Sequence, residues 1–522
     1  MSIAASQRSD TRTYQGLATR FAPLLIAPAA LAILGAWGLT RANTYSDDEI
    51  ATRWAAQLPL HNLFHLLGNV DAVHGLYYLA IHVWIVVGRG PVALRLPSLL
   101  AAVATAGVVT ALGRRLARST VVGVTAGLLY ATSPLVMIYA QTARSYAIVS
   151  LVVALMTLVL VRALDEEADE HQTSAMRRWV VYGFLAALAG WLNEIALLAL
   201  VAHAVTVAVT DTSRRARRRW LVAAASAVVA VSPLLVISER ERNAVEGLSA
   251  PTLHDLNLLV HGFFGPYTAV MVVTIGCTVV ALVSSRRAWR SRKPVGLATV
   301  ALPMLAVPPL LVLVESEIGT PLYAKRYVAY SIVGLVLLVA DGAAKLASRL
   351  GMLRGQVGAW APGIAAVLVV LFAQLPYAAH IRTPDSRERN FAPAAGLLAA
   401  DARPGDGVLF VGDFFRLVQL GYPRAFSDLQ DVDLAASPFA SNTFRGTDAA
   451  LAVTRTRALA CGRIWMVGQT GFVPMPSPQS YFTQIRDLLY SDFSRVELKQ
   501  FHGVAVSLWV RDGPTLTQRS AC

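Results

Sequence analysis

Charged residues are scarce in this chain. Asp, Glu, Lys and Arg together make up 15% of the 522 residues, 55% are hydrophobic, and the mean hydropathy is +0.52. A soluble globular protein of average composition carries about 25% charged residues, so the composition excludes that class. We predict a polytopic integral membrane protein.

Cysteine is rarer still, with three residues in the whole chain. Their spacing fits neither a metal site nor a redox pair. Cys277 lies in an apolar run, where we expect it to be inert packing. Cys461 and Cys522 both fall in the polar C-terminal part, where a disulfide could form if that part faces an oxidising compartment.

The motifs of soluble nucleotide chemistry are missing too. The sequence contains no P-loop, no dinucleotide-binding glycine fingerprint, no metalloprotease helix and no nucleophile elbow. It also shows no internal repeat and no low-complexity segment.

Positive charge is present in excess, with a formal net charge of +14. The excess Arg occurs in short clusters between apolar runs, for example at 114–115, 214–219 and 286–293. This is the pattern of cytoplasmic loops beside anionic lipid, so we expect contact with membrane lipid and no nucleic-acid partner.

Apolar runs near the length of a membrane-spanning helix follow one another up to about residue 380. The first comes after a polar lead and exceeds a signal-peptide core, so we predict an uncleaved span with residues 1–20 in the cytoplasm. The runs occupy residues 21–40, 96–112, 120–138, 145–162, 179–192, 194–210, 220–237, 267–284, 295–314, 327–344 and 357–376.

One further apolar run, 75–87, is too short to be assigned by length alone. If the Arg clusters are cytoplasmic, only one crossing can separate the acids at 47–49 from Arg114. We therefore predict that 75–87 is an interfacial or re-entrant helix within a first external loop, 41–94. The count becomes about eleven spans, which form a module over 21–380 with the C-terminus outside.

The composition changes after about residue 380. A charged linker, 380–390, leads into short β-like runs at 408–411, 464–467 and 504–510, which are separated by Gly, Pro and Asp turn signals. We predict a small extracytoplasmic α/β domain over residues 381–522.

Polar groups gather on the predicted external face. Asp47, Asp48 and Glu49 follow the first span, and Asp71 lies in the same loop. Carboxylates at a membrane boundary are costly to desolvate and suggest a functional role. Bases and cations at one face could act on an acceptor and hold a phosphate. The groups at the other external edges are His74, Tyr78, Arg144, Tyr146, Lys325, Arg326 and Tyr327.

Each of these groups also has a structural interpretation. Asp47 or Asp48 could cap the helix that starts there, and Asp71 could cap the next one. His74 could be an ordinary interfacial residue. Arg144 and Arg326 could be cations that extend towards the interface beside belt tyrosines.

Several stretches, in this order, resemble the GT-C class of membrane glycosyltransferases, and in particular the protein O-mannosyltransferase and aminoarabinose-transferase-like group (glycosyltransferase family 39-like). The resemblance extends over residues 21 to about 345. It is carried by residues 46–52, 71–78, 95–98, 139–146 and 325–327.

The resemblance implies that Asp48 is the general base that deprotonates an acceptor hydroxyl, with Asp71 as the second acid. It implies that Arg144, Lys325 and Arg326 hold the phosphate of a polyprenyl-phosphate sugar. The extra Asp47 leaves open which of the first two acids faces the site. Two departures from the family pattern are Thr142, where relatives commonly have Glu, and Gly75, where they often have Pro.

The same resemblance suggests an actinobacterial type with mannose as the leading sugar and arabinofuranose second. The expected activity is inverting transfer to a hydroxyl of a glycan, lipoglycan or protein at the outer face of the plasma membrane. A transporter or flippase of lipid-linked sugars, and an inactive scaffold of the same fold, remain as alternatives. We expect no cofactor, although the acid triplet could hold a divalent cation.

Overall fold

The computed structural model describes residues 22–168, 172–241, 252–291, 295–318, 324–350, 355–412, 414–470, 481–512 and 522. The predicted cytoplasmic segment 1–20 lies outside this set. The chain divides into two compact units. The helical unit comprises Met1–Leu39, Ala72–Tyr77 and Arg95–Ile381, and the α/β unit comprises Thr40–Asp71, Tyr78–Leu94 and Arg382–Cys522.

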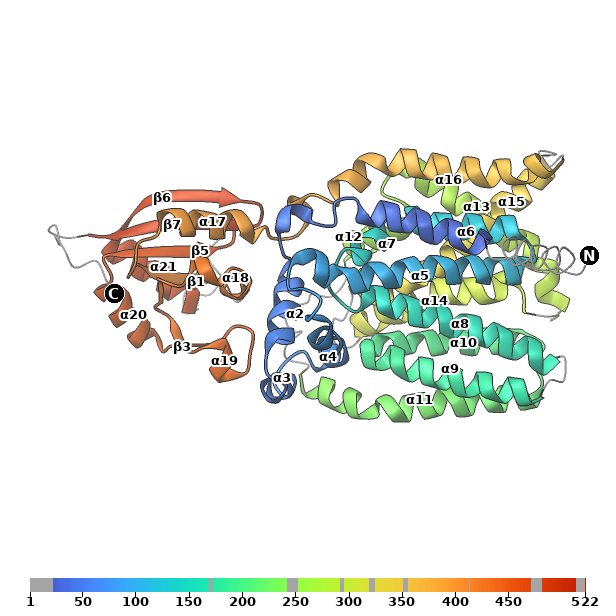
Figure 1. The fold of residues 1–522 in the computed structure, drawn as a ribbon, viewed down its shortest axis with the longest axis horizontal. Coiled ribbons are helices and arrows are strands. Elements are labelled where there is room, and N and C mark those ends of the chain that lie inside the picture. Colours follow the sequence, from blue (N-terminus) through green and yellow to red (C-terminus); the bar gives the residue numbers. More distant parts are fainter. Residues whose placement is uncertain are drawn as a thin grey trace, which may run out of the picture. The chain divides into compact units, whose positions relative to one another are not determined.

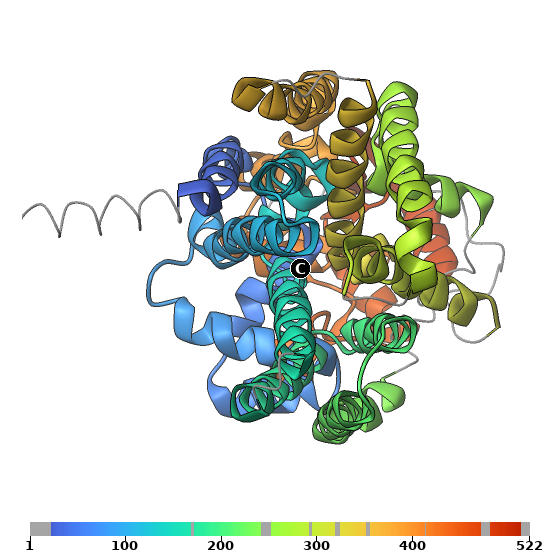
Figure 2. The ribbon, with the colours of Figure 1, turned by 90° about the vertical axis from the view of Figure 1, so that its right-hand side faces the viewer.

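The helical unit is a bundle of apolar helices, seen from the side in Figure 1 and end-on in Figure 2. In the described part of the chain, seven helices are long and apolar enough to cross a membrane, or eight if one bent pair counts as a span. These findings confirm a polytopic helical fold, while the total of about eleven spans stays a prediction. The elements are helix Ala22–Ala36, η2 (Ala72–His74), α5 (Pro91–Ala117), α6 (Thr120–Thr132), α7 (Pro134–Ala140), α8 (Tyr146–Ala168), α9 (Gln172–Leu192), η3 (Glu194–Leu197), α10 (Leu198–Val209), α11 (Arg214–Arg240), α12 (Leu253–Phe264), α13 (Thr268–Ser291), α14 (Leu297–Ile318), η5 (Lys325–Ser331), α15 (Ile332–Arg349) and α16 (Gly355–His380).

The ambiguous apolar stretch 75–87 forms α4 (Gly75–Trp84), a helix of ten residues. A helix needs about 20 residues to cross the hydrocarbon core, so α4 is too short to be a full span. The run 120–138, in contrast, is broken. α6 and α7 meet at an angle of 62°, because Pro134 lacks the N–H that would continue the helix after Ser133.

Two of the helices approach each other closely at a glycine. A Cβ built on Gly342 of α15 would lie 1.8 Å from the carbonyl oxygen of Cys277 on α13, so only glycine fits at this crossing. Cys277 is buried, in agreement with its predicted packing role.

Ion pairs join helix ends at one edge of the helical unit. Asp165, Glu166 and Glu167 at the end of α8 pair with Arg115, Arg178 and Arg219 at N–O distances of 2.7, 2.5 and 2.5 Å. The partners come from α5, α9 and α11, so one acidic turn connects three other helices.

The α/β unit contains a five-stranded sheet in the order β2-β1-β5-β7-β6 (Figure 1). β1 runs parallel to β2 and β5, whereas β7 runs antiparallel to β5 and β6. The strands expected at 408–411, 464–467 and 504–510 are confirmed as β1, β5 and β7. The bounds are β1 (Gly407–Val411), β2 (Gln430–Asp431), β3 (Leu434–Ala436), β4 (Thr447–Asp448), β5 (Arg463–Gly468), β6 (Phe493–Phe501), β7 (Val504–Arg511), α17 (Phe391–Asp401), α18 (Leu417–Gly421), α19 (Pro438–Ser441), α20 (Leu451–Ala460), α21 (Tyr481–Asp492), η6 (Pro384–Ser386) and η7 (Pro423–Ala425).

A disulfide joins Cys461 to Cys522 in this unit. The Cys522 N–H also donates to the carbonyl of Gly405 at 2.9 Å. The C-terminal residue is therefore fixed against the turn that precedes β1. The disulfide that the sequence analysis gave as possible is present in the structure.

Most of the stretch predicted to be the first external loop, 41–94, packs with the C-terminal domain in one unit. The loop contributes η1 (Arg41–Asn43), α2 (Asp47–Gln57), α3 (Leu60–Leu67) and most of α4. Arg53 of α2 donates to the carbonyl of Gly421 at 3.0 Å, and Trp54 meets Phe444 edge to face with ring centroids 5.6 Å apart. The acidic corner is thus part of the α/β unit.

Candidate functional site

The acid triplet forms the first turn of α2. Ser46 is the N-cap: its hydroxyl accepts from the N–H of Glu49, and the Glu49 carboxylate accepts from the N–H of Ser46 at 3.0 Å. This reciprocal pair satisfies two backbone donors at the helix start. The alternative interpretation, in which Asp47 or Asp48 caps the helix, is therefore wrong.

Two arginines from the linker before α17 hold the outer members of the triplet. Arg389 forms an ion pair with Asp47, and the Arg387 guanidinium lies 3.6 Å from Glu49, whose side chain is only 1% exposed. Burial raises the pKa of Asp47, although Arg389 acts in the opposite direction. Neither arginine was predicted as a site residue. The only sign of them in the sequence is the cluster of charges in the predicted linker, 380–390.

The middle acid projects in its own direction. Successive residues of an α-helix are about 100° apart, so Asp48 cannot point where either neighbour points. Asp48 is half-buried, whereas Glu49 is fully buried. Asp47 and Glu49 are engaged by Arg389 and Arg387, so both sequence neighbours of Asp48 are held by arginines of the linker.

The second acid of the loop sits on an unusual backbone. Asp71 has φ 63°, in the left-handed region that Asp tolerates better than most residues. Its carboxylate accepts from the Tyr78 hydroxyl at 2.6 Å. This short bond and the positive φ together fix the carboxylate, and such strained positions are often functional.

In the helical unit, predicted binding residues meet where α8 and η5 begin. Tyr146 contacts the rings of His74 and Tyr327, with both pairs of centroids 6.3 Å apart. The Arg326 guanidinium stacks on Tyr327, 5.2 Å from the ring centroid. Tyr139, not predicted as a site residue, joins the cluster at 5.4 Å from Tyr146. These residues form an aromatic cluster with a cation at its edge.

The other predicted cations occupy the same elements. Arg144 is buried in the turn before α8, and its carbonyl accepts from the Ser98 hydroxyl at 3.1 Å. Lys325 opens η5 and is half-buried. The structure thus assigns the predicted residues to two groups: the acids and Tyr78 belong to the α/β unit, and His74 belongs with the remaining cations and tyrosines to the helical unit.

Within the described ranges, no three His, Cys, Asp or Glu side chains are grouped so that they could hold a metal ion. The arginines beside Asp47 and Glu49 occupy the place that a cation would take at these carboxylates.

Comparison with known proteins shows which fold this chain shares. The family model for dolichyl-phosphate-mannose-protein mannosyltransferases matches residues 73–237, and no curated protein matches the sequence. Together with the structural likenesses given next, this match shows the GT-C glycosyltransferase fold. Within that fold, residues 73–237 are similar to the protein mannosyltransferases, and the chain as a whole is similar in structure to ArnT.

Two solved structures illustrate the likeness. ArnT from Cupriavidus metallidurans, solved with undecaprenyl phosphate, superposes with a TM-score of 0.53 at 13% identity, over 94% of this chain and 98% of that one. The oligosaccharyltransferase AglB from Archaeoglobus fulgidus, solved with an inhibitory peptide and a dolichol-phosphate, gives 0.52 at 11% identity, over 87% and 70%. At these identities the comparison establishes the fold.

Proposed function

We propose that this protein transfers a sugar, with mannose the leading candidate, from a polyprenyl phosphate to the hydroxyl of an acceptor at the outer face of the membrane. The observation that carries the proposal is the acid triplet of α2, in which Arg389 and Arg387 fix the neighbours of Asp48. Rigid neighbours keep a catalytic group in a productive geometry.

In the proposed reaction Asp48 is the general base. Its carboxylate takes the proton of the acceptor hydroxyl as that oxygen attacks the anomeric carbon. The bond from this carbon to the phosphate oxygen breaks, and the bonding electrons leave with polyprenyl phosphate. Configuration inverts, because attack and departure occur on opposite faces of the sugar. Asp71, fixed by Tyr78, orients a hydroxyl of acceptor or sugar.

The helical unit supplies the cations in this proposal. Arg144, Lys325 and Arg326 bind the phosphate and offset the charge that grows as the glycosidic bond breaks. Tyr146 and Tyr327 support this role, since Arg326 is already stacked on Tyr327. A lipid monophosphate stabilised by arginine and lysine needs no metal ion to leave.

Mannose is preferred as the sugar because of the family model that matches residues 73–237. The test is to incubate the purified protein with polyprenyl phosphates that carry mannose, arabinofuranose or aminoarabinose. We expect the mannose donor to be consumed at least about tenfold faster than the others. Consumption of another donor alone would overturn the choice of sugar and leave the reaction class intact.

The disulfide supports an outer location for the α/β unit, because disulfides persist in oxidising compartments and are rare in the cytoplasm. In a Cys277→Ser background, the denatured protein should take up no thiol-reactive maleimide–polyethylene glycol. After reduction it should take up two, one for each remaining cysteine. Full labelling without reductant, in protein from freshly isolated membranes, would contradict the outer location.

A further inference from the structure

The α/β unit contains a cavity of about 260 Å³ that no part of the proposed reaction uses. It lies beside the loops that follow β1 and precede β4, and two of its walls are glycines with positive φ, Gly412 at 104° and Gly446 at 76°. These conformations suit glycine and let the backbone line the cavity closely. The lining residues are Phe410, Gly412, Arg416, Thr443, Arg445, Gly446 and Asp448.

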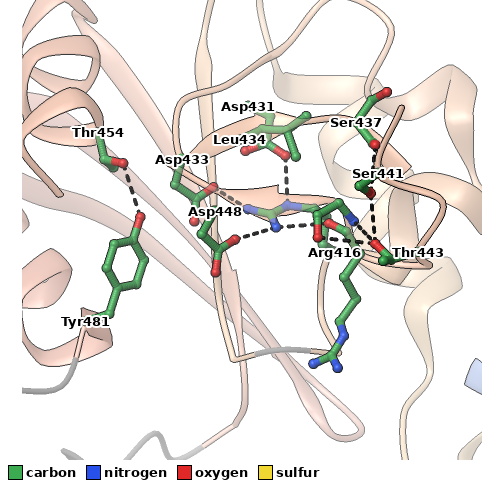
Figure 3. A network of polar contacts seen from close by, with 12 residues as sticks. Arg416, Asp431, Asp433, Leu434, Ser437, Ser441, Thr443, Asp448, Thr454 and Tyr481 are labelled. Carbon is green, nitrogen blue, oxygen red and sulfur yellow. Dashed lines mark hydrogen bonds and ion pairs between the residues drawn. The ribbon is translucent and has the colours of Figure 1, made fainter. Parts of the chain in front are cut away.

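The cavity's polar groups are held rigidly. Arg416 is 6% exposed and binds three carboxylates: Asp431 at 3.0 Å, Asp433 at 2.7 Å and Asp448 at 2.6 Å (Figure 3). It also donates to the carbonyl of Arg445 at 3.0 Å. The Thr443 hydroxyl is fixed in turn, because it accepts from the N–H of Gly446 at 3.0 Å.

This arrangement does not suit an anion. The guanidinium of Arg416 is already shared among three carboxylates, so it offers little attraction to a phosphate or a carboxylate of a ligand. Asp448 is the exception among the three acids, with a side chain that is 44% exposed. The cavity therefore presents a fixed carboxylate, a hydroxyl, a second arginine and backbone groups, which together match the alternating donors and acceptors of neutral hydroxyls.

Two chains of contacts connect the cavity to the acids of the first loop, within the same unit. Arg389, the partner of Asp47, stacks on Phe414 at 5.5 Å, and Arg445 stacks on the same ring at 5.2 Å. On the other route, Tyr78, the partner of Asp71, meets Phe444 at 6.4 Å. Phe444 lies between two residues that line the cavity, Thr443 and Arg445.

We propose that this cavity is an acceptor subsite that binds one neutral sugar unit of a glycan. Its volume is slightly below the range of about 300–1,000 Å³ for sites that hold drug-sized ligands, and this fits a single monosaccharide ring. The inference rests on the proposed function, because it names the acceptor class of that reaction. A glycan held here lies beside Phe414 and Phe444, the rings that also contact Arg389 and Tyr78, which are the partners of Asp47 and Asp71.

Binding is tested without donor, so that the result does not depend on catalysis. The full-length protein in detergent is titrated with neutral oligosaccharides of mannose, arabinofuranose and glucose, with mannose 6-phosphate, and with a Ser/Thr-rich peptide. We expect saturable binding of at least one neutral oligosaccharide. Asp448→Asn and Arg445→Gln should each weaken it at least about tenfold, since each removes a charged hydrogen-bonding group.

The matched controls are Asp428→Asn and Arg424→Gln, exposed residues of the same unit away from the cavity. They should bind as the unaltered protein does. Arg445→Gln keeps the Arg416 network, because Arg416 contacts the backbone carbonyl of residue 445. An unchanged thermal midpoint of unfolding in this variant would show that its loss of binding is local. Three results would each overturn the subsite: no binding of a neutral glycan, tighter binding of the phosphorylated sugar or the peptide, or cavity variants that bind the glycan as tightly as the unaltered protein does. Failure of the proposed function would appear separately, as absence of donor consumption by the unaltered protein.

Discussion

An Asp48→Asn variant should transfer sugar about 10²–10⁴ times more slowly than the unaltered protein, because a general base contributes about that factor. The amide cannot accept the proton of the attacking hydroxyl, but it preserves the size of the side chain. The measurement is transfer of labelled sugar from polyprenyl phosphate in isolated membranes, normalised to the amount of folded protein.

Two comparisons make this result specific. Asp47→Asn loses its ion pair with Arg389 and should slow the reaction less than Asp48→Asn, since in this account it only positions its neighbour. Asp428→Asn, an exposed acid of the same unit, should have no effect. Undiminished transfer by Asp48→Asn would show that Asp48 is not the general base. A larger loss of activity in Asp47→Asn than in Asp48→Asn would assign that role to Asp47.

Replacing Arg416 with Met should destabilise the α/β unit by about 3–5 kcal/mol, the usual cost of removing one partner from a buried ion pair. The side chains of Asp431 and Asp433 are 9% and 2% exposed, so neither carboxylate can recover solvation when the guanidinium is lost. Hydrogen exchange of the β1 and β2 amides in the full-length protein measures the loss. Arg424→Met, an exposed arginine, serves as the control.

The same network gives a pH dependence whose sign can be worked out. Burial, and then the neighbouring Asp431, raise the pKa of Asp433. At Asp433 the folded unit therefore binds more protons than the unfolded chain, so the contribution of this group to stability is full below about pH 4 and is lost as the pH rises towards the folded pKa of about 8. Asp433→Asn should flatten this dependence and partly rescue Arg416→Met. Additive losses in the double variant would contradict the network.

Much of the fold could be predicted because hydrophobic length and charge clusters act locally along the sequence. The β1, β5 and β7 strands could be predicted from short apolar runs between turn residues, and Cys461 and Cys522 were the one pair for which a disulfide was considered. The break between α6 and α7 was also signalled, by Pro134, but was passed over within a continuous apolar run. The capping box was readable as well, since Ser46 and Glu49 stand three residues apart.

The missing part of the candidate site was non-local. Asp47 and its partner Arg389 are separated by 342 residues, and a charged linker gives no sign of which acid it will meet. The cavity around Arg416 is built from loops whose approach depends on the sheet. The predicted residues are divided between two compact units for the same reason. Tertiary packing places most of the first loop in one unit with the C-terminal domain, and this cannot be predicted from local sequence.

The central claim is that the chain breaks the bond between sugar and lipid phosphate, and it can be tested in proteoliposomes with a donor labelled in both the sugar and the lipid. We expect labelled sugar to appear on the acceptor while an equal amount of free polyprenyl phosphate is released, with both products formed about 10²–10⁴ times more slowly by Asp48→Asn. Movement of the intact donor between leaflets, without release of polyprenyl phosphate, would contradict it.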